Sequence, residues 1–396
     1  MPPRRPAPRV ALLIETTRTY SREILSGIRR YISARGPWST FLELRALDSS
    51  PPKWLRTWKG DGILTRTFTR QMARVVEETG LPAVELRSTH LAGNRPFVGM
   101  DNAQIGRMVA EHFHTCGYRH FATYGLATEK FFVERMRNFT ETAAGLGSFC
   151  TSLEARSDQV EDWEQSQKRL TDWVAGLPKP IGIFAANDQL GVHLLEACQR
   201  AGVGVPEELG VVGAENEEAL CSFATPALSS VRFDGDAVGF AAAELLDSLM
   251  QGAPPPCTPL LIPPKGIVIR RSSDELVIHD ALVARAVRVI RENALNGIDV
   301  TDLCQQLRAS RSTLDRRMKA ALQRTPKEEI DRVRFREVER LLRETDLTVE
   351  AIAELTGFVH PHYLHAAFKE LHGMTPGAFR IRHLPDSSAV SEPRRP

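Results

Sequence analysis

Carboxylate and amide side chains follow several short apolar runs in the first two thirds of this chain. The clearest cases are Glu15-Thr16, Asp101-Asn102, Asn187-Asp188 and Glu215-Asn216. Such groups form paired hydrogen bonds with hydroxyls, while aromatic or apolar side chains pack against the C–H groups of a ring. Because the carboxyl ends of parallel strands meet at one edge of a sheet, we expect these residues to surround one ligand. The pattern favours the binding of a small molecule rich in hydroxyl groups.

Each of these polar residues has a second explanation, which is the capping of a helix. Asp101 and Asp188 stand at or beside the start of predicted helices, where a short polar side chain accepts hydrogen bonds from free backbone N–H groups. For these two residues, capping and ligand binding both remain open. For Glu215 and Asn216, ligand contact is the favoured interpretation.

The elements that must position these side chains alternate between strands and helices. Apolar runs separated by amphipathic stretches predict a parallel sheet with helices on both faces. A proline-rich segment at residues 251–264 predicts a loop or boundary. The expected strands span residues 10–14, 40–44, 61–64, 83–86, 97–100, 121–124, 181–185, 209–213 and 267–269.

Length and composition are those of a folded protein with more than one domain. The chain has 396 residues, of which 42% are hydrophobic and 25% charged, and its net charge is only +2. The six cysteines are scattered without a CxxC pair, which argues against a zinc site or a disulfide framework and fits a reducing cytoplasm. Residues 1–9 are basic and proline-rich, so we expect them to be disordered, and the apolar run at 10–14 is too short for a signal peptide.

The last quarter of the chain has the pattern of a helix-turn-helix. Helices are expected at 281–294, 302–307 and 311–320, and the second and third would pack through one apolar seam. That seam consists of Leu303, Leu307, Leu314 and Met318. The residues left facing outward are Arg311, Ser312, Asp315 and Arg316, with Lys319 one turn further on. A reading helix presents such residues to the major groove, where Arg pairs with guanine and Lys contacts phosphate.

Local charge supports this interpretation. Between Arg308 and Arg324 there are six basic residues and one acid, although the whole chain carries only +2. A solvated basic helix face is the alternative. The apolar seam and the turn spacing favour a helix-turn-helix independently of charge.

A second unit of the same kind follows a longer predicted helix at 328–343. Thr348 is expected as an N-cap, Gly357 at a positive φ, and Pro361 in the first turn of the second reading helix. The candidates for DNA contact on this helix are His360, His362, Tyr363, His365 and Lys369. Histidines three residues apart could share a metal ion, but no nearby carboxylate or cysteine completes a ligand set, so we expect no metal and no cofactor.

Residues 281–383 resemble the AraC/XylS-type DNA-binding domain. The resemblance rests on Gly357-Phe358, Phe368-Lys369 and Gly373-x-Thr375-Pro376. It implies two helix-turn-helix units joined by a helix and inserted into successive major grooves. Ala366 stands where this family often has Arg, so we expect the first reading helix to contribute more of the sequence specificity.

Residues 10–272 resemble the sensor core of LacI/GalR-type repressors and periplasmic sugar-binding proteins. The strings that carry the resemblance are 184–191, 205–216 and 226–234. It implies a two-lobed α/β core that binds a sugar, with Arg135 and Phe233 at family ligand positions and Tyr20, Phe131 and Trp163 as stacking candidates. Two departures are Ala214, where an aromatic residue is usual, and Glu215, where the acid is usually Asp.

The two resemblances together match the domain order of the xylose-regulator family of enteric bacteria. They imply a homodimeric, cytoplasmic transcription activator that binds operator DNA, a pentose such as D-xylose and RNA polymerase. A repressor, or a sensor for another sugar, a polyol or a purine, remains an alternative. An enzyme is disfavoured because GxGxxG, GxxxxGK[ST] and GxSxG are missing. The expected division is a sensor at 10–272, a linker at 273–280, a DNA-binding domain at 281–383 and a disordered tail at 384–396.

Overall fold

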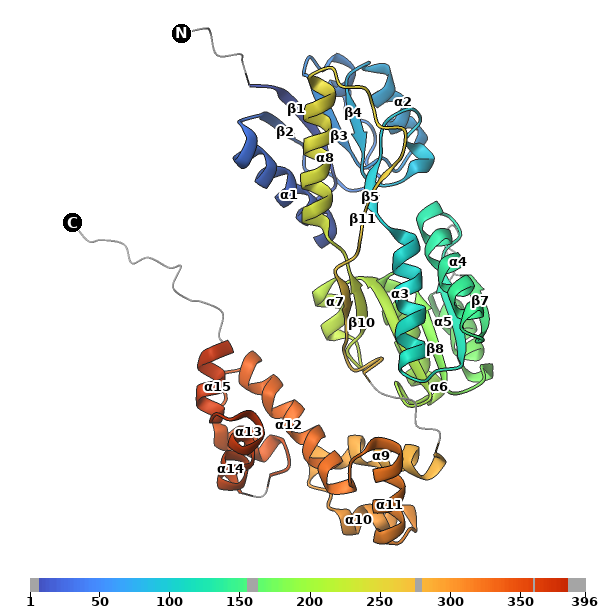
Figure 1. Cartoon of the computed structure of the whole chain (residues 1–396), viewed down its shortest axis with the longest axis vertical. Coiled ribbons are helices and arrows are strands. Elements are labelled where there is room, and N and C mark those ends of the chain that lie inside the picture. Colours follow the sequence, from blue (N-terminus) through green and yellow to red (C-terminus); the bar gives the residue numbers. More distant parts are fainter. Residues whose placement is uncertain (1–6, 155–162, 275–279, 359, 384–396) are drawn as a thin grey trace, which may run out of the picture. The chain divides into compact units, whose positions relative to one another are not determined.

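The computed structural model describes residues 7–154, 163–274, 280–358 and 360–383. The chain divides into two compact units, Met1–Val277 and Ile278–Pro396. Within the described residues, the first unit alternates strands with helices and the second is helical (Figure 1). The predicted fold class, a two-lobed α/β core followed by an all-helical unit, is confirmed. The predictions for residues 1–6, most of the linker and the tail from 384 lie outside the described residues.

The first lobe of the sensor unit, lobe 1, is built on a four-stranded parallel sheet in the order β2-β1-β3-β4. Its strands are β1 (Arg9–Leu13), β2 (Ser39–Leu42), β3 (Gly62–Thr65) and β4 (Ala83–Glu85). Its helices are α1 (Thr19–Arg35), α2 (Arg70–Glu78) and α8 (Gly235–Met250), with short 3-10 turns η1 (Lys53–Thr57) and η2 (Thr89–Leu91).

The side chains of β1 alternate between the two faces of this sheet and pack into a different apolar core on each face. Val10 and Leu12 belong to the apolar core shared with α1 and α8, whereas Ala11 and Leu13 pack with residues of η1 and α2. Successive side chains of a strand point to opposite faces, so a strand that is apolar at every position is buried on both. Figure 1 shows α1 and α8 side by side along one face.

The second lobe, lobe 2, is built on a six-stranded sheet in the order β12-β10-β9-β8-β6-β7. Its strands are β6 (His120–Gly125), β7 (Phe149–Glu154), β8 (Ile181–Ala185), β9 (Leu209–Glu215), β10 (Ser229–Arg232) and β12 (Gly266–Val268). Its helices are α3 (Asn102–Thr115), α4 (Lys130–Gly145), α5 (Trp163–Gly176), α6 (Asp188–Ala201) and α7 (Glu218–Phe223). Only β12 is antiparallel among these described strands.

The chain passes between the lobes after β5 (Val98–Met100), after β10 and after β11 (Leu260–Ile262). β5 and β11 pair in parallel between the two sheets (Figure 1). The prediction of an uninterrupted loop at 251–264 was therefore wrong for the three residues of β11. Prolines at the ends of a short strand leave its interior free to pair, so proline density alone did not exclude an element there.

The sensor unit ends on the sheet of lobe 2. Ser272 is buried, its Oγ accepts a hydrogen bond from Ser229 N (2.8 Å), and its backbone O accepts one from Val211 N (2.8 Å). Ser273 is also buried, with its Oγ 2.9 Å from His112 Nε2. Ser273, expected as the first residue of the linker, is thus packed against the sensor.

The helical unit contains two apolar cores joined by α12. Its helices are α9 (Ala281–Asn293), α10 (Val300–Leu307), α11 (Arg311–Leu322), α12 (Pro326–Glu344), α13 (Val349–Leu355), α14 (Pro361–His372) and α15 (Pro376–His383), with a 3-10 turn η3 (Ala294–Asn296). One core lies among α9, α10 and α11, and the other among α12 to α15. No helix of the described chain is long and apolar enough to cross a bilayer.

The expected turn chemistry of the helical unit is confirmed. Thr348 caps α13 by accepting a hydrogen bond from Ala351 N. Gly357 has a φ of 72°, and Pro361 is the first residue of α14. All four residues of the predicted seam are buried in the first core.

Candidate functional site

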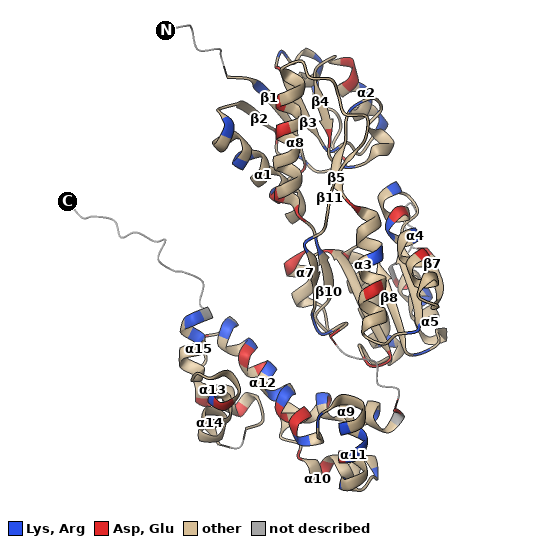
Figure 2. Ribbon diagram, in the orientation of Figure 1, with Lys and Arg blue, Asp and Glu red and all other residues tan. Residues whose placement is uncertain are grey.

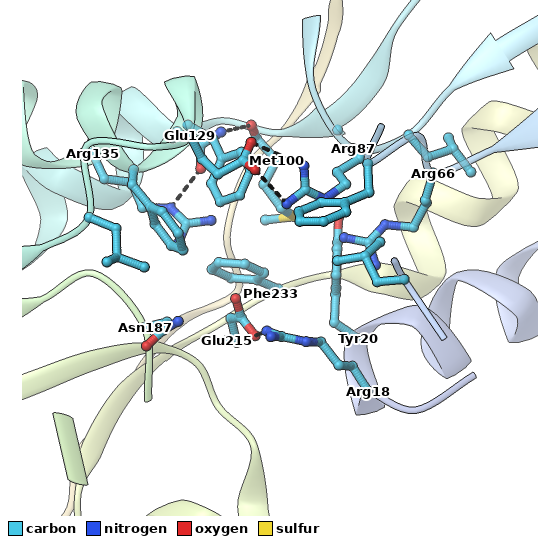
Figure 3. Close-up of a pocket in the computed structure, with 18 of the residues that line it drawn as sticks. Arg18, Tyr20, Arg66, Arg87, Met100, Glu129, Arg135, Asn187, Glu215 and Phe233 are labelled. Carbon is cyan, nitrogen blue, oxygen red and sulfur yellow. Dashed lines mark hydrogen bonds and ion pairs between the residues drawn. The ribbon is translucent and has the colours of Figure 1, made fainter. Parts of the chain in front are cut away.

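A cavity of about 470 Å³ lies between the two lobes of the sensor unit. Polar side chains from both lobes and several aromatic rings line it (Figure 3). The predicted ligand residues that reach this lining are Glu15, Tyr20, Asn102, Arg135, Asn187, Glu215 and Phe233. The strand ends of the two sheets therefore face one space, as expected for parallel strands.

Glu15 lies two residues after β1, and it is only 2% exposed. Its Oε1 accepts a hydrogen bond from Ser21 Oγ (2.8 Å) and pairs with Arg66, which directly follows β3. Its Oε2 is buried and has no hydrogen-bond partner among the described residues. A buried carboxylate oxygen without a donor is costly.

Arg135 reaches the cavity from α4 and is 3% exposed. Its Nε donates to Asn102 Oδ1 (2.7 Å), its Nη1 donates to Ala186 O (2.9 Å), and its guanidinium lies 4.9 Å from the ring centre of Phe233. Burial lowers the pKa of Arg135 to about 10, so the guanidinium remains charged at neutral pH. Fixed donors of this kind can hold a ligand in one orientation.

Aromatic rings form the apolar part of the lining. Tyr20 and Phe233 meet edge to face at 5.3 Å, and the Arg66 guanidinium lies 5.3 Å from the Tyr20 ring centre (Figure 3). Burial raises the pKa of Tyr20 to about 12, so its hydroxyl stays neutral and can both donate and accept hydrogen bonds. Phe131, a predicted stacking partner, also lines the cavity, while the Trp163 side chain lies outside what the structure describes.

Two polar contacts join the lobes on either side of the cavity; we call them the interlobe contacts. In the first, Arg18 pairs with Glu215 at 3.3 Å, and Thr19 N donates to Glu217 Oε2 at 3.2 Å. In the second, Arg87 donates through both terminal nitrogens to Glu129, at 3.0 and 2.9 Å. Each of these contacts bridges the two lobes.

Four predicted ligand residues lie outside the cavity lining. Asp101 caps α3 by accepting a hydrogen bond from Gln104 N (2.8 Å), and Thr16 is not among the residues that line the cavity. Asp188 is buried and accepts a hydrogen bond from Glu217 N (2.7 Å), and burial raises its pKa to about 7. Asn216 has a φ of 54°. Ligand contact by these four residues stays a prediction.

Sequence reasoning missed four charged residues of the lining, Arg18, Arg66, Arg87 and Glu129. A signal existed for two of them. Arg66 directly follows β3 and Arg87 comes two residues after β4, so the strand-end rule that selected Glu15 also applied to them. Arg18 and Glu129 stand at helix starts, where no pattern distinguished them.

The candidate DNA surface of the first helix-turn-helix lies on α11. Arg311, Ser312, Arg316 and Lys319 are exposed, and Asp315 is half-buried. Figure 2 shows basic residues along α11 and α12. Arg311 is 3.9 Å from Asp315, and Arg317 pairs with Asp280 at 2.6 Å.

On the second reading helix, α14, the five predicted residues are exposed while Leu364 and Phe368 point into the core. Only Lys369 among the five is permanently charged.

Comparisons with known families match successive stretches of the chain. A model described as XylR N-terminal domain matches residues 9–102, a periplasmic binding protein-like domain matches 110–273, and a helix-turn-helix domain matches 303–382.

Similar proteins share this order along nearly the full length. A xylose operon regulatory protein of Haemophilus influenzae is 30% identical over 381 residues, which cover 94% of this chain and 98% of that protein. The protein of the same name in Escherichia coli strain K12 is 29% identical over 382 residues, covering 94% and 96%.

Solved structures agree. A structure of the xylose-binding transcription activator XylR superposes with a TM-score of 0.80 at 28% identity, covering 96% of this chain and 99% of that one. The regulator CelR bound to cellobiose covers 67% of this chain and 84% of its own, with a TM-score of 0.53 and 21% identity, and so shares the sensor fold.

Proposed function

The chain belongs to the family of xylose operon regulatory proteins, a family of transcription regulators and not of enzymes, and we propose that it controls xylose catabolism genes in answer to a sugar. The observation that carries the proposal is a cavity lined by polar and aromatic side chains between two lobes, in the same chain as two helix-turn-helix units. Action on chromosomal DNA places the protein in the cytoplasm under this proposal.

Ligand contacts from both lobes supply a mechanism. Glu15 and Tyr20 belong to lobe 1, whereas Arg135, Asn187 and Glu215 belong to lobe 2. A sugar that touches both sets binds the closed sensor more tightly than an open one and shifts the population toward it. If the closed sensor also favours operator binding by a homodimer, sugar and DNA binding are coupled, and activation would then follow from contact with RNA polymerase.

The sugar site is tested by calorimetric titration of the full-length protein with a panel of pentoses and hexoses. Glu215→Ala removes a cavity carboxylate and is expected to weaken sugar binding by about tenfold or more. Glu141→Ala is the matched control, because Glu141 is an exposed carboxylate of the same sensor unit that does not line the cavity. Unchanged affinity in Glu215→Ala would show that the site is assigned wrongly.

The coupling is tested by fluorescence anisotropy of operator DNA with and without the sugar that binds. We expect either the operator affinity or the geometry of the complex to change. If both stay the same at saturating sugar, the regulatory mechanism is wrong even though the sugar binds.

A sensor for a polyol or a purine on the same core is the second candidate function. A thermal-shift screen of pentoses, hexoses, polyols and nucleobases separates the two. A true effector at a hundredfold excess over its dissociation constant stabilises the fold by about 2.7 kcal/mol.

A further inference from the structure

The two helix-turn-helix units share α12, but each packs on a different part of that helix (Figure 1). Ile330 of α12 is buried in the first core, whereas Phe335 and Val338 are buried in the second. The shared helix sets the distance between the two cores along its axis. Because long helices bend, α12 alone does not fix the angle between the units. Direct contacts between the units therefore decide how firmly the two reading helices, α11 and α14, are held relative to each other.

The two units touch directly where the turn after α13 meets η3. A Cβ added at Gly357 would lie 2.7 Å from Ala294 O and 2.9 Å from Leu295 O, so the two backbones are in close contact. Ala294 belongs to the first core, and Phe358, which follows Gly357, belongs to the second. Contact between two backbones prevents a closer approach but does not hold them together. A directional bond across this contact has to come from a side chain.

Arg334 of α12 supplies bonds to both sides of this contact. Its Nε donates to Ala294 O at 2.9 Å and its Nη2 donates to Ile298 O at 3.0 Å, and both oxygens belong to the first unit. On the other side, its guanidinium lies 5.7 Å from the ring centre of Phe358 in the second unit. Arg334 is half-buried, so these contacts are partly shielded from water. One side chain thus links the two helix-turn-helix units.

The chemistry of these contacts suits an arginine better than a lysine. The backbone oxygens at the end of a helix carry partial negative charge and attract a cation. A guanidinium holds its N–H groups in a planar fork, so two hydrogen bonds fix its orientation, whereas an ammonium is a point charge on a flexible chain. The face of an aromatic ring also attracts a cation within about 6 Å. Arg334 is therefore held in one orientation by groups from both units.

Each end of this link reaches a reading helix through one further layer of packing. In the second unit, the ring of Phe358 lies 6.2 Å from the ring of Tyr363, a candidate DNA contact on α14. In the first unit, Ala294 is buried in the same core as Leu314 of α11. A movement of Arg334 relative to either unit would therefore change the position of one reading helix relative to the other.

We infer that Arg334 is a positioning residue that fixes the orientation of α11 relative to α14, and thereby sets the number of base pairs between the two DNA stretches that the protein reads. The inference rests on the proposed function, because both helices must contact one operator. One base pair inserted between the two stretches turns the second groove by roughly 35° and moves it by about 3.4 Å. Two rigidly linked helices cannot follow that change, whereas loosely linked helices can.

Selection of binding sites by the full-length protein tests the inference. Wild type is incubated with a pool of random DNA duplexes of about 30 base pairs, longer than two turns of DNA, and the retained duplexes are sequenced. We expect two short shared stretches at a single separation. Fluorescence anisotropy then compares the selected duplex with versions that have one base pair removed or added between the stretches. We expect wild type to bind the altered duplexes about tenfold or more weakly.

Arg334→Met keeps the approximate length of the side chain but removes its charge and its donors. We expect this variant to select the same two stretches at several separations, with a loss of affinity of about threefold or less for one base pair. The control is Arg340→Met, because Arg340 is exposed on the same helix and pairs with Glu337 of α12 at 3.0 Å. This control loses the same charge and should keep the single separation.

A merely structural role for Arg334 predicts a different result. Arg334→Met would then melt at a lower temperature and bind DNA more weakly, but its dependence on the separation would equal that of wild type. That result in a folded variant overturns the inference. Should Arg334→Met fail to fold by circular dichroism, Arg334→Lys replaces it, since lysine keeps the charge without the fork. Arg334→Lys is expected to depend less on the separation than wild type, and an equal dependence again overturns the inference.

The outcomes for the inference and for the proposed function differ. Selection of a single stretch, or equal affinity of wild type for all separations, overturns the inference while leaving DNA recognition intact. If wild type selects no sequence, the proposed function is contradicted, and the inference with it.

Discussion

Asp188 shows how a single buried side chain can make the sensor sensitive to pH. It is 2% exposed, and burial raises its pKa from the ordinary 3.8 to about 7. A carboxyl whose folded-state pKa is raised stabilises the fold fully below the unfolded value and loses that contribution as the pH rises through the folded value. The contribution of Asp188 therefore falls as the pH increases from about 4 through about 7.

We expect Asp188→Asn to flatten the pH dependence of the melting temperature in this window. Thermal melts of wild type and variant at intervals from pH 4 to 8 measure the difference, which isolates Asp188 from other titrating groups. Asp101→Asn is the control, because Asp101 is a half-buried helix cap. Parallel curves for wild type and Asp188→Asn would contradict the assignment.

The sequence predicted residues of the cavity lining correctly where those residues lie at the end of a strand. Glu15 and Glu215 lie at strand ends, and parallel topology brings such ends together whatever the loop details. The sequence could not show whether Asp101 and Asp188 cap helices or contact a ligand, because both roles require a short side chain that accepts hydrogen bonds. Arg66 and Arg87 also follow strand ends but were missed, because the predicted pattern was one of carboxylates and amides only.

The helix α11 carries the charge that α14 lacks, so we expect Arg316 to matter more for DNA binding than the histidines. Arg316 is exposed and forms no ion pair within the described chain. Arg316→Ala is expected to weaken operator binding by about 1–3 kcal/mol, the range of a lost base contact. His362→Ala should cost less at pH 7.5, and anisotropy titrations at fixed salt compare the two.

Arg317→Ala is the matched control on the same helix. Arg317 pairs with Asp280 at the start of α9, so its loss should lower stability more than it lowers DNA affinity. Equal weakening of operator binding by Arg316→Ala and Arg317→Ala would contradict the prediction. It would mean that α11 attracts DNA only through its total positive charge.

The turn between α13 and α14 depends on a glycine that is both left-handed and closely packed. A Cβ added at Gly357 would lie 2.7 Å from Ala294 O and 2.9 Å from Leu295 O, in addition to the strain at a φ of 72°. Gly373 has a similar φ of 69° with open space around it. We expect Gly373→Ala to destabilise by about 1 kcal/mol and Gly357→Ala by more.

Thermal melts of the full-length variants, followed by circular dichroism, measure both substitutions. An equal loss of stability at the two glycines would mean that the close contact between this turn and η3 adds nothing to the destabilisation by a Cβ at Gly357.

At the scale of elements, apolar runs predicted most strands but not every buried one. β10, with the sequence SSVR, lies inside the sheet of lobe 2 and was not predicted, because its first two residues are serines. β8 was predicted at its observed bounds because all its residues are buried. β7 was not predicted: it is an edge strand whose residues are half-buried or exposed, so its sequence has no apolar run. β11 was hidden by the prolines around it, and its pairing with β5 depends on a neighbour that local sequence does not specify.

For the sensor unit as a whole, the interlobe contacts would stabilise the closed form that the proposed mechanism requires. Glu129→Gln leaves the half-buried Arg87 without its ion pair and is expected to weaken closure, lowering sugar affinity by about tenfold. Small-angle scattering should show a larger mean radius of gyration without ligand.

Glu78→Gln is the control for this substitution, because Glu78 pairs with Arg56 at 2.8 Å within lobe 1. An unchanged scattering profile and an unchanged affinity in Glu129→Gln would show that the cleft is held closed by other means.

The path of the chain between the lobes limits where the gene of such a protein can recombine with another gene. Lobe 1 takes its strands from residues 9–85 but its helix α8 from 235–250, so any crossover inside the sensor gene divides a lobe. Ser273 is the last residue seen packed on the sensor sheet, and α9 begins eight positions later at Ala281. A single genetic exchange in that short interval would join an intact sensor to a different DNA-binding domain. Evolution, or an engineer, can therefore combine sensors and DNA-binding domains at this junction.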